Sequence, residues 1–259
     1  MFFVSSCVRE RDTDLSVASQ AAMMQLYFMD AIDICNDAAT KNTGDFLSNY
    51  NPTGNCASII HDNVSTPRTI TINFGPTACT QLDGRTRSGI VKITYNGNYN
   101  DDGETHQIEF IDYKINGHQV TSTNFSVHNR GVNSSAQSQY DIIIDGGKVV
   151  IADTAGEMYW NANQLRTFKE GDGNTQYKDD IYAYSGKASG KNPQGLSFAV
   201  GFRSPLLKTA MMQCRHFVGG IMDVQLQGHT LRSIDFGNVN CENNATVTLD
   251  NKTFDLILP

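Results

Sequence analysis

Apolar residues recur at helical spacing along residues 12–41. This stretch contains no Gly or Pro, and it begins with Asp12, Thr13 and Asp14, which are residue types that cap helix N-termini well. The apolar positions follow one another at steps of three or four residues: Val17, Ala21, Met24, Phe28, Ile32 and Cys35. Such steps share one face of a helix, so the pattern predicts a helix of about 25 residues. Cys35 ends the stripe, and we expect it to be a small buried hydrophobe rather than a reactive thiol.

From about residue 57 onward the pattern changes to that of β-strands. Short runs rich in Ile, Val, Thr, Tyr and Phe are separated by turn-forming Asn-Gly and Asp-Gly pairs. In one run Val91, Ile93 and Tyr95 share a face, and the two residues between them are polar. The pattern predicts about ten to thirteen antiparallel strands in a meander, with one face on a core and the other in water.

One run breaks this alternation. Along residues 108–115 the apolar phase slips between Phe110 and Ile111, so that two consecutive residues are apolar. The slip predicts either a bulge or a strand that is covered on both faces.

Together these elements predict an α+β fold that is mostly β. A long N-terminal helix would pack on a large curved antiparallel sheet, an incomplete barrel-like meander, with the helix against or inside the concave face. We expect residues 12–259 to form a single helix-plus-antiparallel-sheet domain, after a signal-peptide remnant, lipobox and tether at residues 1–11. The Gly- and Lys-rich segment near 186–195 marks the alternative, a subdivision into two stacked β-domains.

A short phrase occurs twice in the chain: residues 72–79 read INFGPTAC and residues 234–241 read IDFGNVNC. Both copies look like strand ends that run into a Gly turn and then reach a cysteine. We interpret the phrase as scaffold. The unrepeated segment DGRTRSG, at residues 83–89, follows only the first copy and is the better candidate for function.

Each copy also has a second cysteine upstream, 23 residues before Cys79 and 27 residues before Cys241. This duplicated spacing predicts local bridges between Cys56 and Cys79 and between Cys214 and Cys241. Each bridge would close a loop of roughly 25 residues and contribute about 3 kcal/mol in the chain-entropy model. Disulfides persist in oxidising compartments, so the pairing predicts export past the inner membrane.

The composition narrows the range of partners. The chain has 259 residues, of which 39% are hydrophobic, and a net charge of −7. We expect no nucleic-acid partner, because binding phosphates requires clustered Lys and Arg. No apolar run approaches the length of a transmembrane helix.

The N-terminus has a lipobox-like tetrapeptide, Val4-Ser5-Ser6-Cys7. An aliphatic residue, two small residues and an acylated cysteine end the signal peptides of bacterial lipoproteins. The apolar region before Cys7 is shorter than a signal peptide requires, so we expect the true start upstream. The motif predicts lipid attachment at Cys7, and therefore a membrane partner through this anchor.

Four motifs occur together: FGPTAC at 74–79, DGRTRSG at 83–89, VKITY at 91–95, and DFG-x3-C-x3-ATVTLDNKTFDLIL at 235–258. With the truncated lipobox, they resemble a family of uncharacterised Bacteroidota envelope lipoproteins. The similarity covers most of the chain from about residue 56 onward. It implies an anchored envelope protein and carries no activity.

The sequence contains no catalytic or metal-binding motif. No two of the six His residues stand at metal-ligand spacing, and there is no H-E-x-x-H, G-x-S-x-G or P-loop. We therefore predict no metal, no cofactor and no catalytic residue. The candidates for ligand binding are Arg85 and Arg87 in the unrepeated segment, together with Tyr159 and Trp160, which could stack on a sugar. A lone Trp in a strand pattern is more often a core residue.

These patterns favour an exported, lipid-anchored cell-envelope protein of the outer membrane, periplasmic or surface-exposed, that is a non-enzymatic binding or structural module. Its partner would be a glycan or an apolar molecule held by the curved sheet. One alternative is a carrier of an apolar molecule. Another is a carbohydrate-active enzyme of the glycosidase type, which needs two carboxylates in a cleft. The candidate carboxylates are Asp83, Glu109, Asp112 and Glu157.

Overall fold

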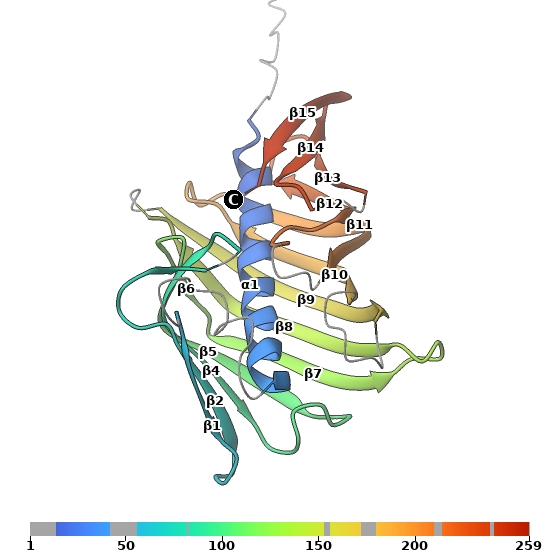
Figure 1. Ribbon diagram of the computed structural model, residues 1–259. Helices are drawn as coiled ribbons and strands as arrows, with labels where there is room; N and C mark the ends of the chain where they lie inside the picture. Colours follow the sequence, from blue (N-terminus) through green and yellow to red (C-terminus); the bar gives the residue numbers. More distant parts are fainter. Residues whose placement is uncertain are drawn as a thin grey trace, which may run out of the picture.

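The computed structural model describes residues 14–41, 56–81, 83–152, 156–171, 180–209, 214–238 and 241–258. They form one helix and fifteen strands in a single sheet (Figure 1). In chain order the elements are α1 (Ser16–Lys41), β1 (Ser58–Asp62), β2 (Arg68–Asn73), β3 (Cys79–Thr80), β4 (Thr86–Tyr95), β5 (Thr105–Ile115), β6 (His118–Thr121), β7 (Asn124–Val132), β8 (Ser138–Val150), β9 (Glu157–Glu170), β10 (Ile181–Lys191), β11 (Ser197–Thr209), β12 (Gly219–Leu226), β13 (Arg232–Asn238), β14 (Asn244–Leu249) and β15 (Lys252–Ile257). The predicted fold class is confirmed. The strand count is higher than predicted, because strands as short as β3 and β6 leave no periodic pattern.

The sheet is an antiparallel meander with the strand order β1-β2-β4-β5-β6-β8-β9-β10-β11-β12-β13-β14-β15. In addition, β3 pairs with β4, and β7 pairs with both β5 and β8. Among the described strands, β1 pairs only with β2 and β15 only with β14, so the sheet curves without closing. The segment near 186–195 forms the end of β10 and the turn into β11 within this same sheet.

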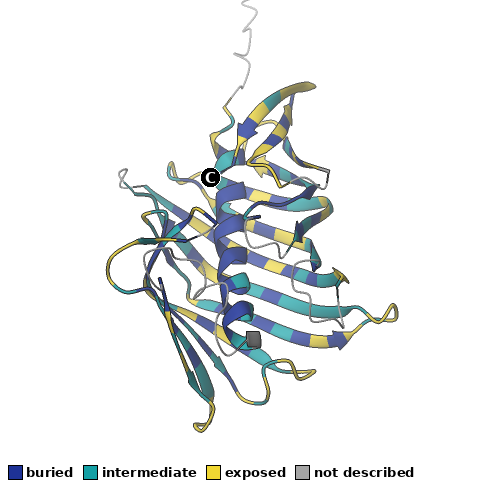
Figure 2. Ribbon diagram, viewed as in Figure 1, coloured by how far each residue is buried: buried dark blue, intermediate teal, exposed yellow. Residues whose placement is uncertain are grey.

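Helix α1 lies across the concave side of the sheet, and the strands run across it (Figure 1). Asp14 caps its N-terminus, since the carboxylate accepts hydrogen bonds from the backbone N and the Oγ of Ser16, at 2.8 and 2.9 Å. The helix is buried nearly all round (Figure 2), and residues outside the predicted stripe, such as Leu26 and Tyr27, are fully buried. An enclosed helix of this kind needs apolar residues on every side.

Two loops from opposite halves of the chain meet beside α1. Arg85, just before β4, donates a hydrogen bond from Nη2 to the carbonyl oxygen of Arg215 at 2.9 Å. Arg215 in turn donates from Nη1 to the carbonyl oxygen of Asp83 at 3.2 Å. These contacts join segments 130 residues apart in the sequence.

Both predicted disulfides are present, Cys56–Cys79 and Cys214–Cys241, with Cα–Cα distances of 5.6 and 5.5 Å. They indicate an exported, non-cytosolic protein. Cys35 is buried as predicted, and burial raises the pKa of its thiol well above the usual value. In the described part of the chain, no helix combines the length and apolar character needed to cross a membrane. The proposed lipid attachment site Cys7 lies outside the described residues.

Candidate functional site

The two copies of the repeated phrase build the same turn. In the first, the side-chain Oδ1 of Asn73 accepts a hydrogen bond from the backbone N of Gly75 at 2.8 Å. In the second, Oδ1 of Asp235 accepts from the backbone N of Gly237 at 2.9 Å. The two glycines have φ angles of 76° and 83°, in the left-handed region that L side chains rarely adopt. The near-isosteric Asn and Asp side chains therefore perform the same local function.

Beside the first turn, a bulge shifts the register between β4 and β5. The shift falls between Ser88 and Ile90, so that Asp112 and Tyr113 of β5 both oppose Gly89 of β4. A Cβ atom on Gly89 would lie 2.3 Å from the carbonyl oxygen of Asp112, which explains why this position is glycine. Asp112 has a φ of 50°, an uncommon conformation for a residue other than glycine. The slip seen in the sequence is therefore a bulge, one of its two predicted explanations.

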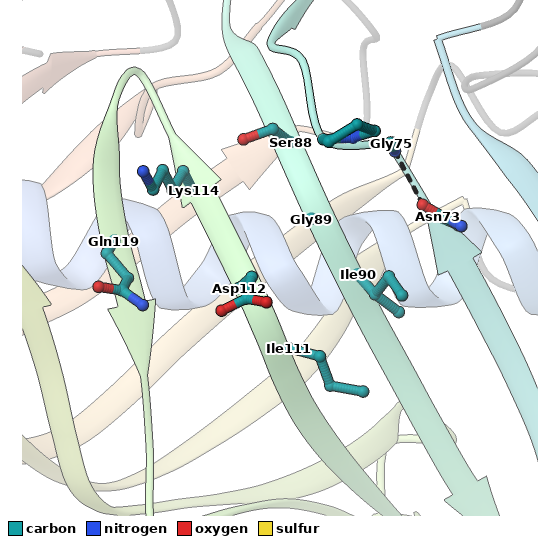
Figure 3. A pocket seen from close by; sticks show the side chains of 10 residues that line it. Asn73, Gly75, Ser88, Gly89, Ile90, Ile111, Asp112, Lys114 and Gln119 are labelled. Atoms are coloured by element: carbon teal, nitrogen blue, oxygen red, sulfur yellow. Dashed lines mark hydrogen bonds between the residues drawn. The ribbon is translucent and has the colours of Figure 1, made fainter.

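The turn and the bulge together form a cleft of about 520 Å³ on the face of the sheet that points away from α1 (Figure 3). This volume lies within the range of about 300–1,000 Å³ that is typical of small-molecule sites. Ile90 and Ile111 supply an apolar surface, and Ile111 is 40% exposed. The lining residues come from β2, β4, β5, β6 and the turn after β2: Asn73, Gly75, Pro76, Ser88, Gly89, Ile90, Ile111, Asp112, Lys114 and Gln119.

Most polar side chains of this cleft are uncommitted. Those of Ser88, Asp112, Lys114 and Gln119 form no hydrogen bond or ion pair within the described part of the chain. Asn73 uses its Oδ1 in the turn, which leaves its amide nitrogen as a donor. The cleft therefore offers a carboxylate, an ammonium, a hydroxyl and two amide groups to a ligand.

On the opposite face of the same strands, an ion cluster attaches β4 to α1. The Asp30 carboxylate accepts hydrogen bonds from Nη1 of Arg85 at 2.7 Å and from Nη2 of Arg87 at 2.5 Å. Arg87 Nη2 also donates to Asp83 at 2.6 Å, and the hydroxyl of Tyr113 donates to Asp30 at 3.4 Å. Burial alone would raise the pKa of Asp30, but Arg87 and Arg85 hold it below its usual range. All members of the cluster are buried.

The predicted ligand candidates Arg85 and Arg87 thus lie inside the protein, paired with Asp30, and neither of them lines the cleft. The sequence pattern gave no indication of this pairing, because Asp30 is 55 and 57 residues away in the chain.

The other two candidates point to opposite faces of β9. Tyr159 is 42% exposed, and its hydroxyl donates to Glu157 Oε2 at 2.6 Å, while Lys148 donates to Oε1 of the same carboxylate at 3.1 Å. Trp160 is fully buried in the core, with its ring centroid 6.1 Å from that of Phe198. The structure therefore does not bring Tyr159, Trp160 and the two arginines together.

Of the four candidate carboxylates, only Asp112 lines the cleft. Asp83 belongs to the ion cluster, and Glu157 is paired with Lys148. Glu109 lies opposite Lys92 in the β4–β5 ladder, outside the cleft.

Sequence reasoning missed Asn73, Ser88, Lys114 and Gln119 as members of one site. Two signals pointed toward it. The phase slip located the bulge, and the Asn-Gly pair after β5 predicted the hairpin that places Gln119 opposite Lys114.

The second copy lines a smaller cleft of about 220 Å³. Its lining residues are Asp235, Phe236, Gly237, Glu242, Asn244, Ala245 and Thr246. Within the described residues, no group of three or more His, Cys, Asp or Glu side chains is arranged to hold a metal ion. No family model, curated protein or solved structure matches the chain.

Proposed function

We propose that this is an exported, lipid-anchored protein of the bacterial outer membrane that binds a small ligand without transforming it. The anchor would be a lipid on Cys7, and the binding site would be the cleft beside the first turn. One observation carries the proposal: uncommitted polar side chains surround an apolar surface in a cleft of about 520 Å³. Clefts that combine apolar surface with a few convergent polar groups are the usual form of small-molecule sites.

The packing around α1 favours a site on the outer face over an apolar carrier. The helix occupies the concave face of the sheet, and its side chains are part of the core cluster that includes Phe125 and Trp160. A molecule carried inside would have to displace this packing, in which most residues of the helix are buried.

The arrangement of carboxylates favours binding over glycoside hydrolysis. Both stereochemical types of glycosidase use two carboxyl groups that flank the bond to be broken. Asp112 is the only carboxylate that lines the larger cleft in the described residues, and the buried Asp83 is neutralised by Arg87. The smaller cleft holds two, Asp235 and Glu242, but Oδ1 of Asp235 is occupied by the backbone N of Gly237 in the turn. These observations support a non-enzymatic role.

Isolation of the protein from native membranes tests all three parts of the proposal. Mass spectrometry should find a diacyl- or triacylglyceryl group on Cys7, whereas an unmodified Met1 would contradict the anchor. A small molecule should co-purify with the wild type and be absent from the double variant D112N/K114Q. Identical co-purified molecules in both proteins would exclude the cleft as the site. Release of a shortened or cleaved ligand by the purified wild type would contradict the non-enzymatic role.

The chain offers a matched control in D250N/K252Q. Asp250 has the same φ of 50° as Asp112, and both Asp250 and Lys252 are exposed outside the two clefts. The control should retain the ligand, because it removes the same charges from a different part of the surface.

A further inference from the structure

We infer that the ligand of the larger cleft is a short, neutral oligosaccharide, whose hydroxyls donate hydrogen bonds to Asp112 and accept them from Lys114 and Gln119. The inference rests on the proposed function, because it names the chemical class of ligand for the same cleft. Three properties of the cleft carry it: the charge balance, the state of the surrounding backbone and the mixture of polar and apolar surface.

The charge balance favours a neutral ligand. Among the residues that the structure describes, Asp112 and Lys114 are the only charged ones that line the cleft, and their formal charges cancel. An anionic ligand would meet the unpaired Asp112 carboxylate, and a cationic one would meet the Lys114 ammonium. A sugar hydroxyl both donates and accepts hydrogen bonds, so a neutral saccharide satisfies the two groups at once.

The two backbone groups of Gly89, at the bulge, are already paired and offer a peptide nothing to bind. Gly89 donates from its backbone N to the carbonyl oxygen of Gly75 at 2.7 Å, and its own carbonyl oxygen accepts from the backbone N of Phe74 at 2.9 Å. Extended peptides are commonly recognised by adding a strand to free backbone groups at a sheet edge. The cleft lies among β2, β4, β5 and β6, inside the sheet, and offers side-chain groups instead.

The remaining surface suits a ring that is polar at its edge and apolar on its face. Ile90, Ile111 and Pro76 can pack against the C–H face of a sugar, while the amides of Gln119 and Asn73 reach its hydroxyls. A purely apolar ligand would remove these polar groups from water without replacing their hydrogen bonds, which is unfavourable. Among the described residues no aromatic side chain lines the cleft, so the ring is held without aromatic stacking.

The test is a titration of the full-length, 15N-labelled protein followed by the side-chain amide signals of Gln119 and Asn73. The probes are a pooled panel of neutral di- and trisaccharides, trigalacturonate as a charged saccharide, trialanine as a peptide, and laurate as an apolar molecule. We expect the neutral panel to shift both signals, and the other three probes to leave them in place.

Two cleft variants then measure the contribution of each charged group. D112N keeps the backbone, because Asn adopts the left-handed conformation as readily as Asp. D112N and K114Q should each weaken binding of the active saccharide about tenfold, the effect of losing one charge-assisted hydrogen bond. D250N and K252Q, at exposed positions outside the cleft, should bind as the wild type does.

The outcomes separate the inference from the proposed function. Shifts caused only by trialanine, laurate or trigalacturonate would overturn the neutral-saccharide inference and leave the cleft as a binding site. Equal weakening by the cleft and control variants would also overturn it. If no probe shifts the two amides and no molecule co-purifies from native membranes, both the inference and the proposed function fail.

Discussion

The turn after β2 and the turn within β13 have the same backbone geometry, yet the first lines a cleft of about 520 Å³ and the second one of about 220 Å³. The difference lies in the strands beside each turn. The first cleft is bordered by β4, β5 and β6, and its charged residues are Asp112 and Lys114. The second is lined by residues of β13, of β14 and of the segment just before β14, and it contains two carboxylates, Asp235 and Glu242.

This comparison separates what the repeated phrase encodes from what its neighbours add. A glycine bulge also lies beside the second turn, since Gly220 of β12 has a φ of 100° and a Cβ there would lie 2.3 Å from the carbonyl oxygen of Pro205. Turn, bulge and disulfide are therefore shared by both copies. The larger volume and the pair of opposite charges, Asp112 and Lys114, belong to the first copy alone, which supports the interpretation of the phrase as scaffold.

The two copies are also attached to α1 by different ion pairs. Breaking these pairs should give the largest difference in free energy of unfolding between variants of the two copies. Asp30 is buried with Arg85 and Arg87 beside the first copy. Beside the second copy, Lys208 of β11 contacts Asp33 at 2.5 Å, and the Asp33 side chain is 26% exposed. D30N leaves the buried Arg85 without a counter-charge and Arg87 with Asp83 alone, so it should lower the free energy of unfolding by about 3–5 kcal/mol. D33N should cost about 1–3 kcal/mol, because it breaks one ion pair, at a carboxylate that is already partly solvated, whereas D30N breaks two fully buried ones.

Urea unfolding of the two variants measures this difference. D33N is the matched control, since it removes the same charge from the same helix one turn away. If D30N lowers the free energy of unfolding no more than D33N does, the ion cluster contributes little to attaching the first copy to α1.

The sequence was sufficient to predict the parts of this molecule that depend on local pattern. The helix followed from its apolar steps, the sheet from its alternation, and the disulfide pairing from the duplicated cysteine spacing. The bulge was one of two explanations of the phase slip. The cleft required the register of four strands, and the role of Arg85 and Arg87 required knowing that Asp30 lies beneath them. Neither the register between distant strands nor the facing side of an enclosed helix leaves a local signal.

Acid should weaken the two copies over different pH ranges. His216 lies two residues after Cys214, near the second copy, and burial, together with the positive Arg85 and Arg215, lowers its pKa to about 4 from an ordinary 6.5. The unfolded chain therefore binds this proton first, and the free energy of unfolding falls as the pH drops from about 6.5 to about 4. Asp30, with its lowered pKa, stabilises the fold above its unfolded value of about 3.9, and this contribution is lost as the pH falls further.

Urea midpoints of the wild type, H216Q and D30N over this pH range test the separation. In H216Q the urea midpoint should depend less on pH between about 6.5 and 4, and in D30N it should depend less on pH below about 4. Burial also lowers the pKa of His106 to about 4, so part of the upper slope should remain in H216Q and disappear in the double variant H106Q/H216Q. A steep upper slope that persists in the double variant would contradict the assignment.

The smallest expected effect tests the shared turn itself, through G75A and G237A. A Cβ atom at either glycine meets nothing within 4 Å, so the cost comes from the left-handed backbone alone. Each substitution should lower the free energy of unfolding by about 1–2 kcal/mol, and the two losses should be equal within error. Thermal or urea unfolding measures both. A clear inequality would mean that one copy carries a constraint beyond its turn. Equal losses would support assigning the difference between the two clefts to the neighbouring strands rather than to the phrase that the chain repeats.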